Sequence, residues 1–457
     1  MNYVQITPAQ RDEMLATIGV DSVERLFDPI PEHVRFGREL DIPEGISELE
    51  IQRELAGLAA KNQSATAQVC FMGGGAYDHF IPAFIDQLIS RGEFLTAYTP
   101  YQAEASQGSL QAFFEFQTQI ARLTGLDIAN ASLYEGSTAA AEGMLMALNH
   151  TGRKRVLVAG TVHPHTRQVL KTYISDLPVD IVEVPAGADG VVSAAAIEKA
   201  LDAQTACLVV QSPNVFGLVE DWEGLFAAAK RAPVQGVAPL AIAVFNPISL
   251  GMLRTPGECG ADVAAGEGQA LGTPLQFGGP YLGLFAAKKE FLRRMPGRLV
   301  GQTADRKGRT GYCLTLQTRE QHIRKDKATS NICTNQGLFA LRATMYMTAM
   351  GPGGLRTVAE QCYHKARYLA GKIAGLEGYS LKHSGGGPGF WNEFVVSCPK
   401  PADEVAAGCA AAGVLAGVPL GDARMDRIGG ANDLLVAVTE KRTRAEMDRL
   451  VGLLAAV

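Results

Sequence analysis

Two segments of the sequence carry residues suited to binding an anion. In the first, LYEGSTAAAEGMLMAL (133–148), an apolar run ends and Gly136, Ser137 and Thr138 open a helix of small residues. A helix N-terminus presents free N–H groups and the positive end of the helix dipole, so it can hold a phosphate, and the two hydroxyls could add donors. The plainer alternative is that Ser137 or Thr138 only caps the helix.

The second segment, REQHIRKDKATSNICTNQ (319–336), precedes a long predicted helix. Hydroxyls and amides at the start of a helix, behind a cationic cluster, suit an anion. A basic face that is merely solvated would give the same pattern, so both interpretations stay open. The residues concerned are Arg319, Arg324, Lys325, Lys327, Thr329, Ser330, Thr334 and Asn335.

Two histidines, His163 and His165, follow the apolar run VLVAG in the segment GTVHPHTRQVLKTY (160–173). An imidazole at the end of a strand could stack on a flat ring or transfer a proton. His165 could equally be an ordinary surface residue. No carboxylate or cysteine lies at a supporting spacing, so we predict no metal site.

Two tyrosines, Tyr98 and Tyr101, flank Thr99-Pro100 in the loop ahead of a helix that starts near Ser109. Loops of this kind often line a binding site. A buried aromatic cluster is an equal alternative, and the sequence leaves both open.

The segment GEGQALGTPLQFGGP (266–280) lies between two apolar runs, PLAIAVF and YLGLFAA, and the pattern predicts two buried strands joined by a ligand loop. In one large group of cofactor enzymes, a loop of this kind carries a lysine that forms a Schiff base. Here no lysine occurs from Ala232 to Ala287. The first run ends at Asn246, an amide at a position where a carboxylate could hold a cofactor ring protonated.

The bulk composition favours a soluble globular enzyme. The chain has 457 residues, of which 47% are apolar and 19% charged. The net charge of −5 argues against a nucleic-acid or membrane-surface binder. Eight cysteines occur singly, which favours reduced thiols. With no secretory signal and no apolar run of membrane-spanning length in the sequence, we expect a cytoplasmic protein.

Strand-like and helical patterns alternate along residues 65–290. This alternation predicts an α/β fold whose mostly parallel central sheet is covered by helices on both faces. Ligands bind such sheets at the carboxyl ends of the strands. The predicted strands are 156–160, 180–185, 206–211, 240–245 and 281–287.

The chain is predicted to have three parts: a helical arm (1–62), a large α/β domain (63–330) and a small C-terminal α+β domain (331–457). In the arm, Thr7-Pro8 and the pair Ser47 and Glu50 are helix-start signals. In the small domain, a long helix runs from about residue 335 to GPGG, and a second helix follows.

Together and in this order, these segments resemble the N-terminal half of the glycine cleavage system P-protein, the glycine decarboxylase. The resemblance is to the α form, subunit 1, of the enzyme that is split into two chains. An undivided P-protein would be about twice this length. The resemblance spans residues 71–337, and the segments that carry it are FMGGGAYDHFIPAFI, residues 94–143, GADVAAGEGQALGTPLQFGGPYLGLFA and GRTGYCLTLQTREQHIRKDKATSNICTNQGL.

The resemblance implies fold type I of the pyridoxal-phosphate-dependent enzymes. It puts Gln269 at the position of the Schiff-base lysine and Asn246 at that of the ring-nitrogen aspartate, whereas His163 keeps the position of the ring-stacking histidine. It therefore implies that this chain has no catalytic residue of its own. The cofactor would be bound covalently by the partner β subunit, in an α2β2 heterotetramer.

The family reaction decarboxylates glycine on pyridoxal phosphate and passes the aminomethyl group to the lipoyl carrier, the H-protein. In fold type I dimers each site is built from both chains, so the resemblance implies that this chain contributes to the site of the β subunit. The expected contributors are Tyr98, Tyr101, Ser137, Thr138, His163, Gln276, Phe277, Gly278, Gly279, Thr334 and Asn335.

Two other readings stay open. The chain could be a scaffolding or regulatory pseudoenzyme subunit that touches no substrate. It could also be a self-sufficient pyridoxal-phosphate enzyme with its lysine elsewhere. For the latter the nearest candidates are Lys288 and Lys289, which have the pattern of a solvated helix start. A nicotinamide dehydrogenase is excluded because no GxGxxG fingerprint follows a strand.

Overall fold

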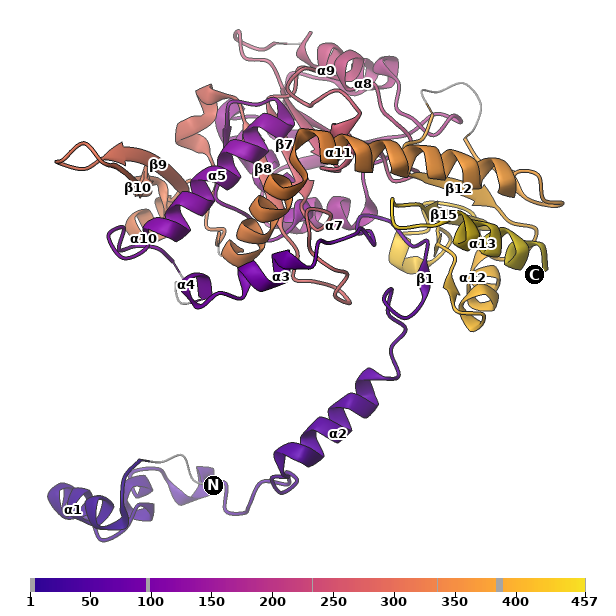
Figure 1. Ribbon diagram of the computed structural model, residues 1–457. Helices are drawn as coiled ribbons and strands as arrows, with labels where there is room; N and C mark the ends of the chain where they lie inside the picture. Colours follow the sequence, from indigo (N-terminus) through magenta and orange to yellow (C-terminus); the bar gives the residue numbers. More distant parts are fainter. Residues whose placement is uncertain (1–4, 96–98, 232, 335, 384–388, 457) are drawn as a thin grey trace. The chain divides into compact units, whose positions relative to one another are not determined.

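The computed structural model describes residues 5–95, 99–231, 233–334, 336–383 and 389–456 (Figure 1). The chain divides into two compact units, residues 1–63 and residues 64–457. Among the described residues, no helix is both long and apolar enough to cross a membrane.

The N-terminal unit consists of α1 (Pro8–Ile18), α2 (Glu48–Ala59) and two short 3-10 helices, Glu24–Phe27 and Glu32–Val34. Both α-helices begin where the sequence predicts, with Thr7 and Ser47 as the N-caps, and both N-caps form capping boxes. Among the described residues of this unit, only Leu15 is buried. Large apolar side chains are exposed along the unit, among them Ile18, Phe27, Val34, Phe36, Leu40, Ile42, Leu49, Leu55 and Leu58.

The second unit is built on a seven-stranded sheet. Five neighbouring strands run parallel, β8 pairs with them in the antiparallel direction, and β2 pairs antiparallel with β8 at the edge of the sheet, which confirms the predicted mostly parallel α/β fold. The strands in spatial order are β2 (Ile128–Ala129), β8 (Gly283–Ala287), β7 (Val263–Glu267), β6 (Leu240–Phe245), β5 (Thr205–Ser212), β3 (Arg155–Ala159) and β4 (Asp180–Val184).

Strand β7 is one of the elements that the sequence patterns miss, because residues 246–280 read as one long loop. Its sequence, VAAGE, has only one β-branched residue, so it has little β-propensity. The small side chains have a packing role. A Cβ on Gly143 of the neighbouring helix α6 would lie 3.3 Å from Val263, so helix and strand pack closely. The predicted single loop between two strands is therefore wrong.

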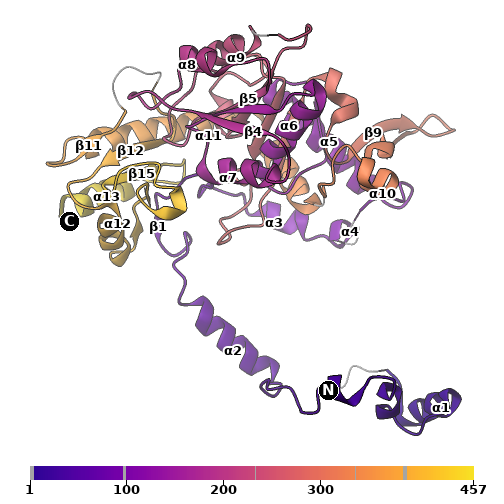
Figure 2. The ribbon, with the colours of Figure 1, turned by 180° about the vertical axis from the view of Figure 1, so that it is seen from behind.

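Helices cover the sheet. Figure 2 shows α8 (Ala194–Ala200) and α9 (Trp222–Lys230) above strands β4 and β5, and α7 (Pro164–Tyr173) below them. Helix α6 (Gly136–Thr151) packs on α7 and on β5 to β8, and α5 (Gln107–Thr124) packs on α11 (Gly337–Ile373). Helix α11 is broken at Gly351, where φ is 59°, which is the stop that GPGG predicts.

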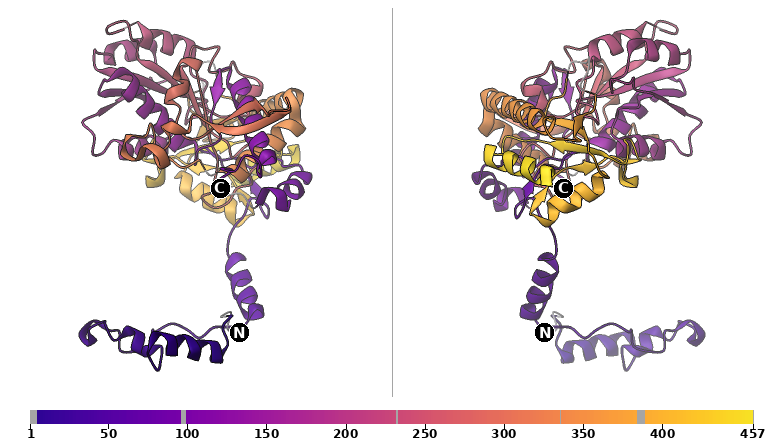
Figure 3. Two further views of the ribbon diagram at one scale, coloured as in Figure 1. Left: turned by 90° about the vertical axis from the view of Figure 1, so that its left-hand side faces the viewer. Right: turned by 90° about the vertical axis from the view of Figure 1, so that its right-hand side faces the viewer.

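A second, smaller sheet holds the C-terminal part of the unit. Its antiparallel strands, in order, are β11 (Ser380–Leu381), β12 (Glu393–Ser397), β15 (Asp433–Ala437) and β14 (Val418–Pro419). Helices α12 (Ala402–Ala411) and α13 (Arg444–Ala456) complete this part, and α13 lies beside α11 (Figure 3). Its own buried cluster surrounds Phe71, Leu369, Phe394 and Val436.

The segment that opens the second unit joins this C-terminal part. Strand β1 (Val69–Cys70) pairs in parallel with β13 (Val414–Leu415), and Phe71 packs in the smaller core. The sequence groups these residues with the large domain, because long-range pairing leaves no local signal. The division of residues 64–457 into a large and a small domain stays a prediction.

A hairpin of β9 (Leu299–Ala304) and β10 (Thr310–Thr315) projects from the unit at the end away from α12 and α13 (Figure 1). The remaining elements are short: α3 (Phe84–Ile89), α4 (Gly92–Leu95), α10 (Gln321–Arg324) and the 3-10 turns Ser249–Gly251, Lys289–Arg294, Gln317–Arg319, Lys325–Lys327 and Ala423–Met425.

Candidate functional site

A cavity of about 230 Å³, called here the central cavity, lies at the carboxyl ends of β5, β6 and β7 beside the start of α6. This is where ligands bind in doubly wound sheets. It gathers five residues singled out from the sequence, Gly136, Ser137, His163, His165 and Asn246. The other lining residues are Gly74, Gly75, Ala76, Tyr77, Glu135, Thr166, Gln211, Pro213, Val244, Phe245, Glu267, Ala270, Tyr281 and Asn392.

His163 caps the start of α7 and is held as a neutral imidazole. Its Nδ1 accepts the backbone N–H of His165 at 3.2 Å, and its own backbone N–H donates to Gln211 Oε1 at 2.9 Å. Burial, helped by the nearby His165 and Arg167, lowers the pKa of His163 to about 4. Its Nε2 is buried without a protein partner. His163 therefore brings a flat, uncharged ring to the cavity.

Asn246 ends β6, and its side chain helps to shape the turn that follows. Its Oδ1 accepts the backbone N–H of Ile248 at 3.0 Å, and its backbone carbonyl accepts the hydroxyl of Ser249 at 2.8 Å. A neutral amide in this position offers no negative charge to a protonated ring nitrogen.

Gln269, placed by the resemblance at the lysine position, turns away from the central cavity. Its side-chain amide bonds the backbone of Tyr77 twice, at 2.9 and 3.0 Å, and the carbonyl of Thr273 at 2.7 Å. The next residue, Ala270, is the one that lines the cavity. Gln269 itself is not among the residues that line the cavity.

The start of α6 is closed by carboxylates. Glu135 is the N-cap, and it forms a reciprocal capping box with Thr138, whose N–H donates to Glu135 Oε1 at 2.9 Å. The N–H of Gly136 donates to Glu267 Oε2 at 3.0 Å. Ser137 shares a 2.9 Å hydrogen bond with Thr166. For Thr138 the capping alternative is thus the one observed, and Thr138 is absent from the cavity wall.

Pyridoxal phosphate, the cofactor that the resemblance implies, does not fit this chain's own cavity. Among the described residues that line it there is no lysine to form a Schiff base and no arginine to meet a phosphate. The helix start already binds a carboxylate. Lys288 forms an ion pair of 2.6 Å with Asp262, which directly precedes β7, at the strand end opposite to the cavity. Lys288 therefore does not supply the missing anchor.

Buried carboxyl groups are a feature of this region that the sequence does not reveal. Glu393 of β12 accepts the Tyr77 hydroxyl and the backbone N–H of Gly74, both at 2.7 Å. Burial raises the pKa of Glu393 to about 7, although both of these hydrogen bonds oppose the shift. Glu393 lies in a strand pattern far along the chain, so only the tertiary fold brings it here.

This raised pKa predicts a pH dependence of stability. Between about pH 4.5 and 7 the folded chain keeps a proton on Glu393 that the unfolded chain loses, so stability falls as the pH rises, by about 3 kcal/mol for a shift of this size. Burial likewise raises the pKa values of Glu142 and Glu267 to about 7, and lowers that of His163 to about 4, so His163 contributes a slope of opposite sign.

The variant Glu393→Gln isolates one of these groups. Its unfolding free energy relative to the parent chain is expected to increase by about 3 kcal/mol between pH 4.5 and 8, measured by urea unfolding at several pH values. Glu404→Gln, at an exposed glutamate of α12, serves as the control and leaves the slope unchanged. Parallel stability curves for Glu393→Gln and the parent chain would contradict the buried, protonated carboxyl.

A second cavity of about 200 Å³, called here the arginine cavity, gathers Tyr101 and two parts of the basic segment, residues 319–322 and 329–334. The predicted cations Arg324, Lys325 and Lys327 do not line it and are exposed. At its centre, Arg298 donates from Nη1 to the Thr334 hydroxyl at 3.1 Å and from Nη2 to the Tyr101 hydroxyl at 3.2 Å. Glu320 holds the guanidinium by an ion pair of 3.3 Å to Nε. The full lining is Tyr101, Met295, Gly297, Arg298, Arg319, Glu320, Gln321, His322, Thr329, Ser330, Ile332, Cys333 and Thr334.

The arginine cavity joins residues that are far apart in the sequence. Tyr101 and Thr334 were both singled out as candidates, and the structure brings them together through Arg298. Arg298 itself was missed, because it lies in a generally polar and basic stretch without a pattern around it. Tyr98 and Asn335 lie outside the described residues.

The loop that carries Gln276 to Gly279 stands at the surface. Phe277 is 75% exposed and has a φ of 48°, and the two glycines that follow also have positive φ, 113° and 106°. The N–H of Gly279 donates to the Gln276 carbonyl at 3.2 Å. An aromatic side chain exposed on a tight turn leaves apolar surface in contact with water, and it suits contact with another chain.

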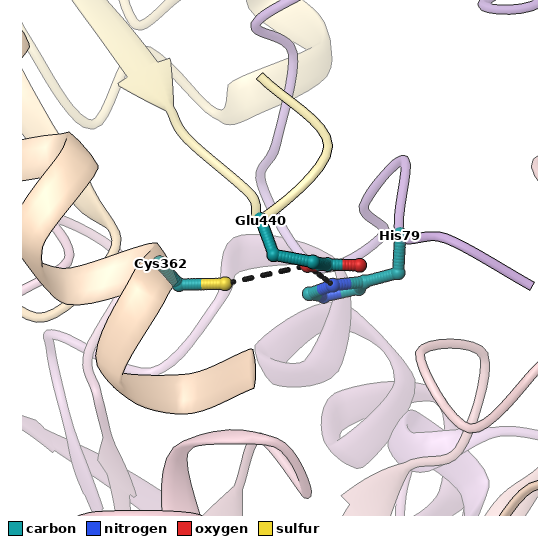
Figure 4. A group of neighbouring side chains, drawn as sticks. All are labelled: His79, Cys362 and Glu440. Carbon is teal, nitrogen blue, oxygen red and sulfur yellow. Dashed lines mark hydrogen bonds and ion pairs between the residues drawn. The ribbon is translucent and has the colours of Figure 1, made fainter. Parts of the chain in front are cut away.

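His79, Cys362 and Glu440 form a buried cluster in which their ligand atoms lie within 4.8 Å of one another (Figure 4). Glu440 Oε2 bonds His79 Nδ1 at 2.7 Å and accepts the Cys362 thiol at 3.5 Å. Burial raises the pKa of Cys362, so the sulfur keeps its proton. We interpret the cluster as a hydrogen-bonded tie between the loop after β1, helix α11 and the segment after β15.

Comparison with known proteins identifies the family of this chain. A model of the glycine cleavage system P-protein family matches residues 1–454. A Thermomicrobium roseum protein called probable glycine dehydrogenase (decarboxylating) subunit 1 is 51% identical, over 97% of each chain. A protein of the same name from Prosthecochloris aestuarii is 50% identical over the whole of both chains.

Solved structures show the same relationship. Glycine decarboxylase (P-protein) of the glycine cleavage system, solved in inhibitor-bound form, has a TM-score of 0.88 at 42% identity and covers 100% of both chains. A glutamate decarboxylase of Lactobacillus brevis, 12% identical with a TM-score of 0.67 over 94% of this chain and 96% of its own, shares the fold only. The fold is that of the fold type I pyridoxal-phosphate-dependent enzymes. Matched along its whole length by relatives at about half identity, the chain belongs to the glycine cleavage system P-protein family.

Proposed function

We propose that this chain is the subunit of a decarboxylating glycine dehydrogenase that lacks the cofactor lysine, and that it completes an active site whose pyridoxal phosphate is bound covalently by a second, β subunit. Relatives called subunit 1 imply such a second subunit. The central cavity of this chain does not fit the cofactor, so the cofactor site is sought on the partner. An α2β2 heterotetramer in the cytoplasm suits this division of roles.

The arginine cavity is the observation that carries the proposal. The guanidinium of Arg298 is held by Glu320 and by the hydroxyls of Thr334 and Tyr101. A fixed guanidinium fork with adjacent hydroxyl donors is suited to a phosphate or carboxylate. We place this cavity at the contact with the β subunit, where it would bind an anionic group of the cofactor or of glycine.

The roles of this chain are binding and orientation. Pyridoxal phosphate, when bound by the partner, supplies the electron sink into which the bond to the departing carboxylate is broken. Arg298 and the hydroxyls beside it would fix the anionic groups before that step, and the exposed loop 276–279 would help to exclude water. The aminomethyl group then passes to the lipoyl arm of the carrier H-protein.

The surface of the N-terminal unit favours contact with a partner chain. Its helices expose large apolar side chains such as Phe27, Phe36 and Leu55, while only Leu15 is buried among its described residues. A segment that buries so little of its own apolar surface needs another surface to cover it. We propose that this arm packs on the β subunit.

A mixing experiment tests the proposal. Pyridoxal phosphate is titrated into this chain alone, into the β subunit alone and into the mixture, each with the oxidised lipoyl carrier protein present as acceptor, while visible absorbance and release of labelled carbon dioxide from glycine are followed. We expect no lysine-bound cofactor band from this chain alone, and decarboxylation only in the mixture. A band from this chain alone that maps to one of its lysines would overturn the proposal.

The scaffolding alternative makes a different prediction for the same mixture. A scaffold that touches no substrate would tolerate Tyr101→Phe and Thr334→Val without loss of turnover or cofactor affinity. The proposal expects each variant to lower one of these, since each removes a hydrogen-bond partner of Arg298.

A further inference from the structure

The start of α6 in the central cavity is occupied by the chain itself. Glu267, the last residue of β7, places its carboxylate against the first N–H of the helix, with Oε2 3.0 Å from the nitrogen of Gly136. The approach is possible because residue 136 is glycine. A Cβ there would lie 2.9 Å from the backbone nitrogen of Glu267.

The carboxylate of Glu267 is bound by more than the helix. Its Oε1 accepts the backbone N–H of Gln269 at 2.9 Å and that of Leu282 at 3.2 Å. Three backbone donors from three segments therefore converge on a single side chain. An arrangement of N–H groups at a helix start is what binds a phosphate in other proteins, and here an internal anion satisfies it.

The surroundings of this position add further negative charge and no cation. Glu135 accepts the N–H of Thr138 at 2.9 Å on the same helix turn, and it lines the cavity beside Glu267. Among the described lining residues the only basic side chains are His163 and His165, and burial keeps His163 neutral, with a pKa of about 4. Above about pH 7, where Glu267 is ionised, a second anion would meet repulsion that no described cation of the cavity lining offsets.

We infer that the carboxyl group of Glu267 occupies the position at the start of α6 where a phosphate would bind. It thereby excludes phosphate groups, and with them pyridoxal phosphate, from the central cavity of this chain. The loss of a lysine would remove only the covalent bond. Glu267 removes the non-covalent anchor as well, so the cofactor of the assembled enzyme is directed to the partner alone. The inference concerns this chain's own cavity and holds whether or not the arginine cavity serves a partner.

Removing the carboxylate tests the inference on the full-length chain. In Glu267→Ala the three N–H groups lose their acceptor, and we expect pyridoxal phosphate to bind at least about tenfold more tightly than to the parent chain in equilibrium dialysis. Inorganic phosphate should raise the melting temperature of Glu267→Ala and leave that of the parent chain unchanged. Pyridoxal, which has no phosphate, should bind both chains equally.

Glu267→Gln keeps the volume of the side chain and removes its charge, so it decides the question if the alanine variant does not fold. We expect it to gain affinity for pyridoxal phosphate over pyridoxal. Glu393→Gln, at another buried glutamate that accepts a backbone N–H but not that of the helix start, is the matched control and should gain none.

Two results would overturn the inference. One is the absence of any gain in affinity for pyridoxal phosphate in a folded Glu267 variant relative to the parent chain. The other is an equal gain for pyridoxal and its phosphate, which would mean that Glu267 blocks the cavity only by its size. The mixing experiment described for the proposed function does not depend on the results for the Glu267 variants. The inference about Glu267 and the proposed function can therefore each fail without the other.

Discussion

Replacing Arg298 by alanine is expected to lower glycine decarboxylation by the assembled enzyme by about a hundredfold, the usual cost of removing a preorganised donor from a developing or bound anion. Arg298 is the group that joins Tyr101, Thr334 and Glu320 in the arginine cavity. Without it, the two hydroxyls lose the donor that orients them. Arg298→Lys keeps the charge but not the planar fork, so an intermediate loss of about tenfold is expected.

The measurement is the turnover and the cofactor affinity of the complex formed with the β subunit. Arg309→Ala, in the β9–β10 turn with a side chain 74% exposed, is the matched control and should change neither. Arg298→Ala leaves the buried Glu320 without its cation and is therefore expected to lower stability. The double variant Arg298→Ala/Glu320→Gln is expected to restore stability without restoring activity. Activity of Arg298→Ala within twofold of the parent enzyme would remove the arginine cavity from the active site.

Replacing Gly217 by alanine is expected to cost 4 kcal/mol or more of stability, roughly the upper range for a single substitution. Gly217 follows β5 in a turn and has a φ of 81°, and an added Cβ would lie 2.0 Å from the carbonyl oxygen of Glu393. Its own carbonyl accepts the N–H of Trp391 at 3.0 Å. The substitution would therefore push β12 away from the end of β5. It would also displace Glu393, which accepts hydrogen bonds from Tyr77 and Gly74 of the cavity lining.

Gly260 provides the control for the backbone strain alone. It has a φ of 87° and no atom within 4 Å of an added Cβ. Gly260→Ala should cost only about 1 kcal/mol, the penalty for alanine in a left-handed conformation. Urea unfolding gives the loss of unfolding free energy in each variant, and the difference between the two losses measures the effect of the close approach between the turn and β12. Equal losses in the two variants would mean that β12 can move to accept the added Cβ without loss of stability.

Features that depend on a few neighbouring residues could be read from the sequence. The helix starts at Thr7 and Ser47 and the helix break at Gly351 occur as predicted, because a cap or a stop needs only three or four adjacent residues. Five strands of the central sheet were found from apolar runs. Strands β2 and β7 were not, because β2 has only two residues and the sequence of β7, VAAGE, is not a continuous apolar run.

The same distinction separates the parts of the candidate site. His163 and Asn246 were found because each directly follows a strand, and strand ends meet at one edge of a parallel sheet. The direction of Gln269 could not be found, since a turn after β7 decides whether residue 269 or residue 270 faces the cavity. The missing lysine is evident in the sequence, whereas its structural consequence depends on that turn.

The sequence by itself determined the family, the fold class, the absence of a lysine in the ligand loop and the amide at the end of β6. These are properties of residue type and order along the chain. Only the tertiary structure decided that Glu267 covers the start of α6, that Glu393 of the other sheet accepts hydrogen bonds from the lining residues Tyr77 and Gly74, and that Arg298 joins Tyr101 to Thr334. The physical reason is that these contacts join segments far apart in the chain, and their geometry follows from how sheets and helices pack rather than from any local pattern.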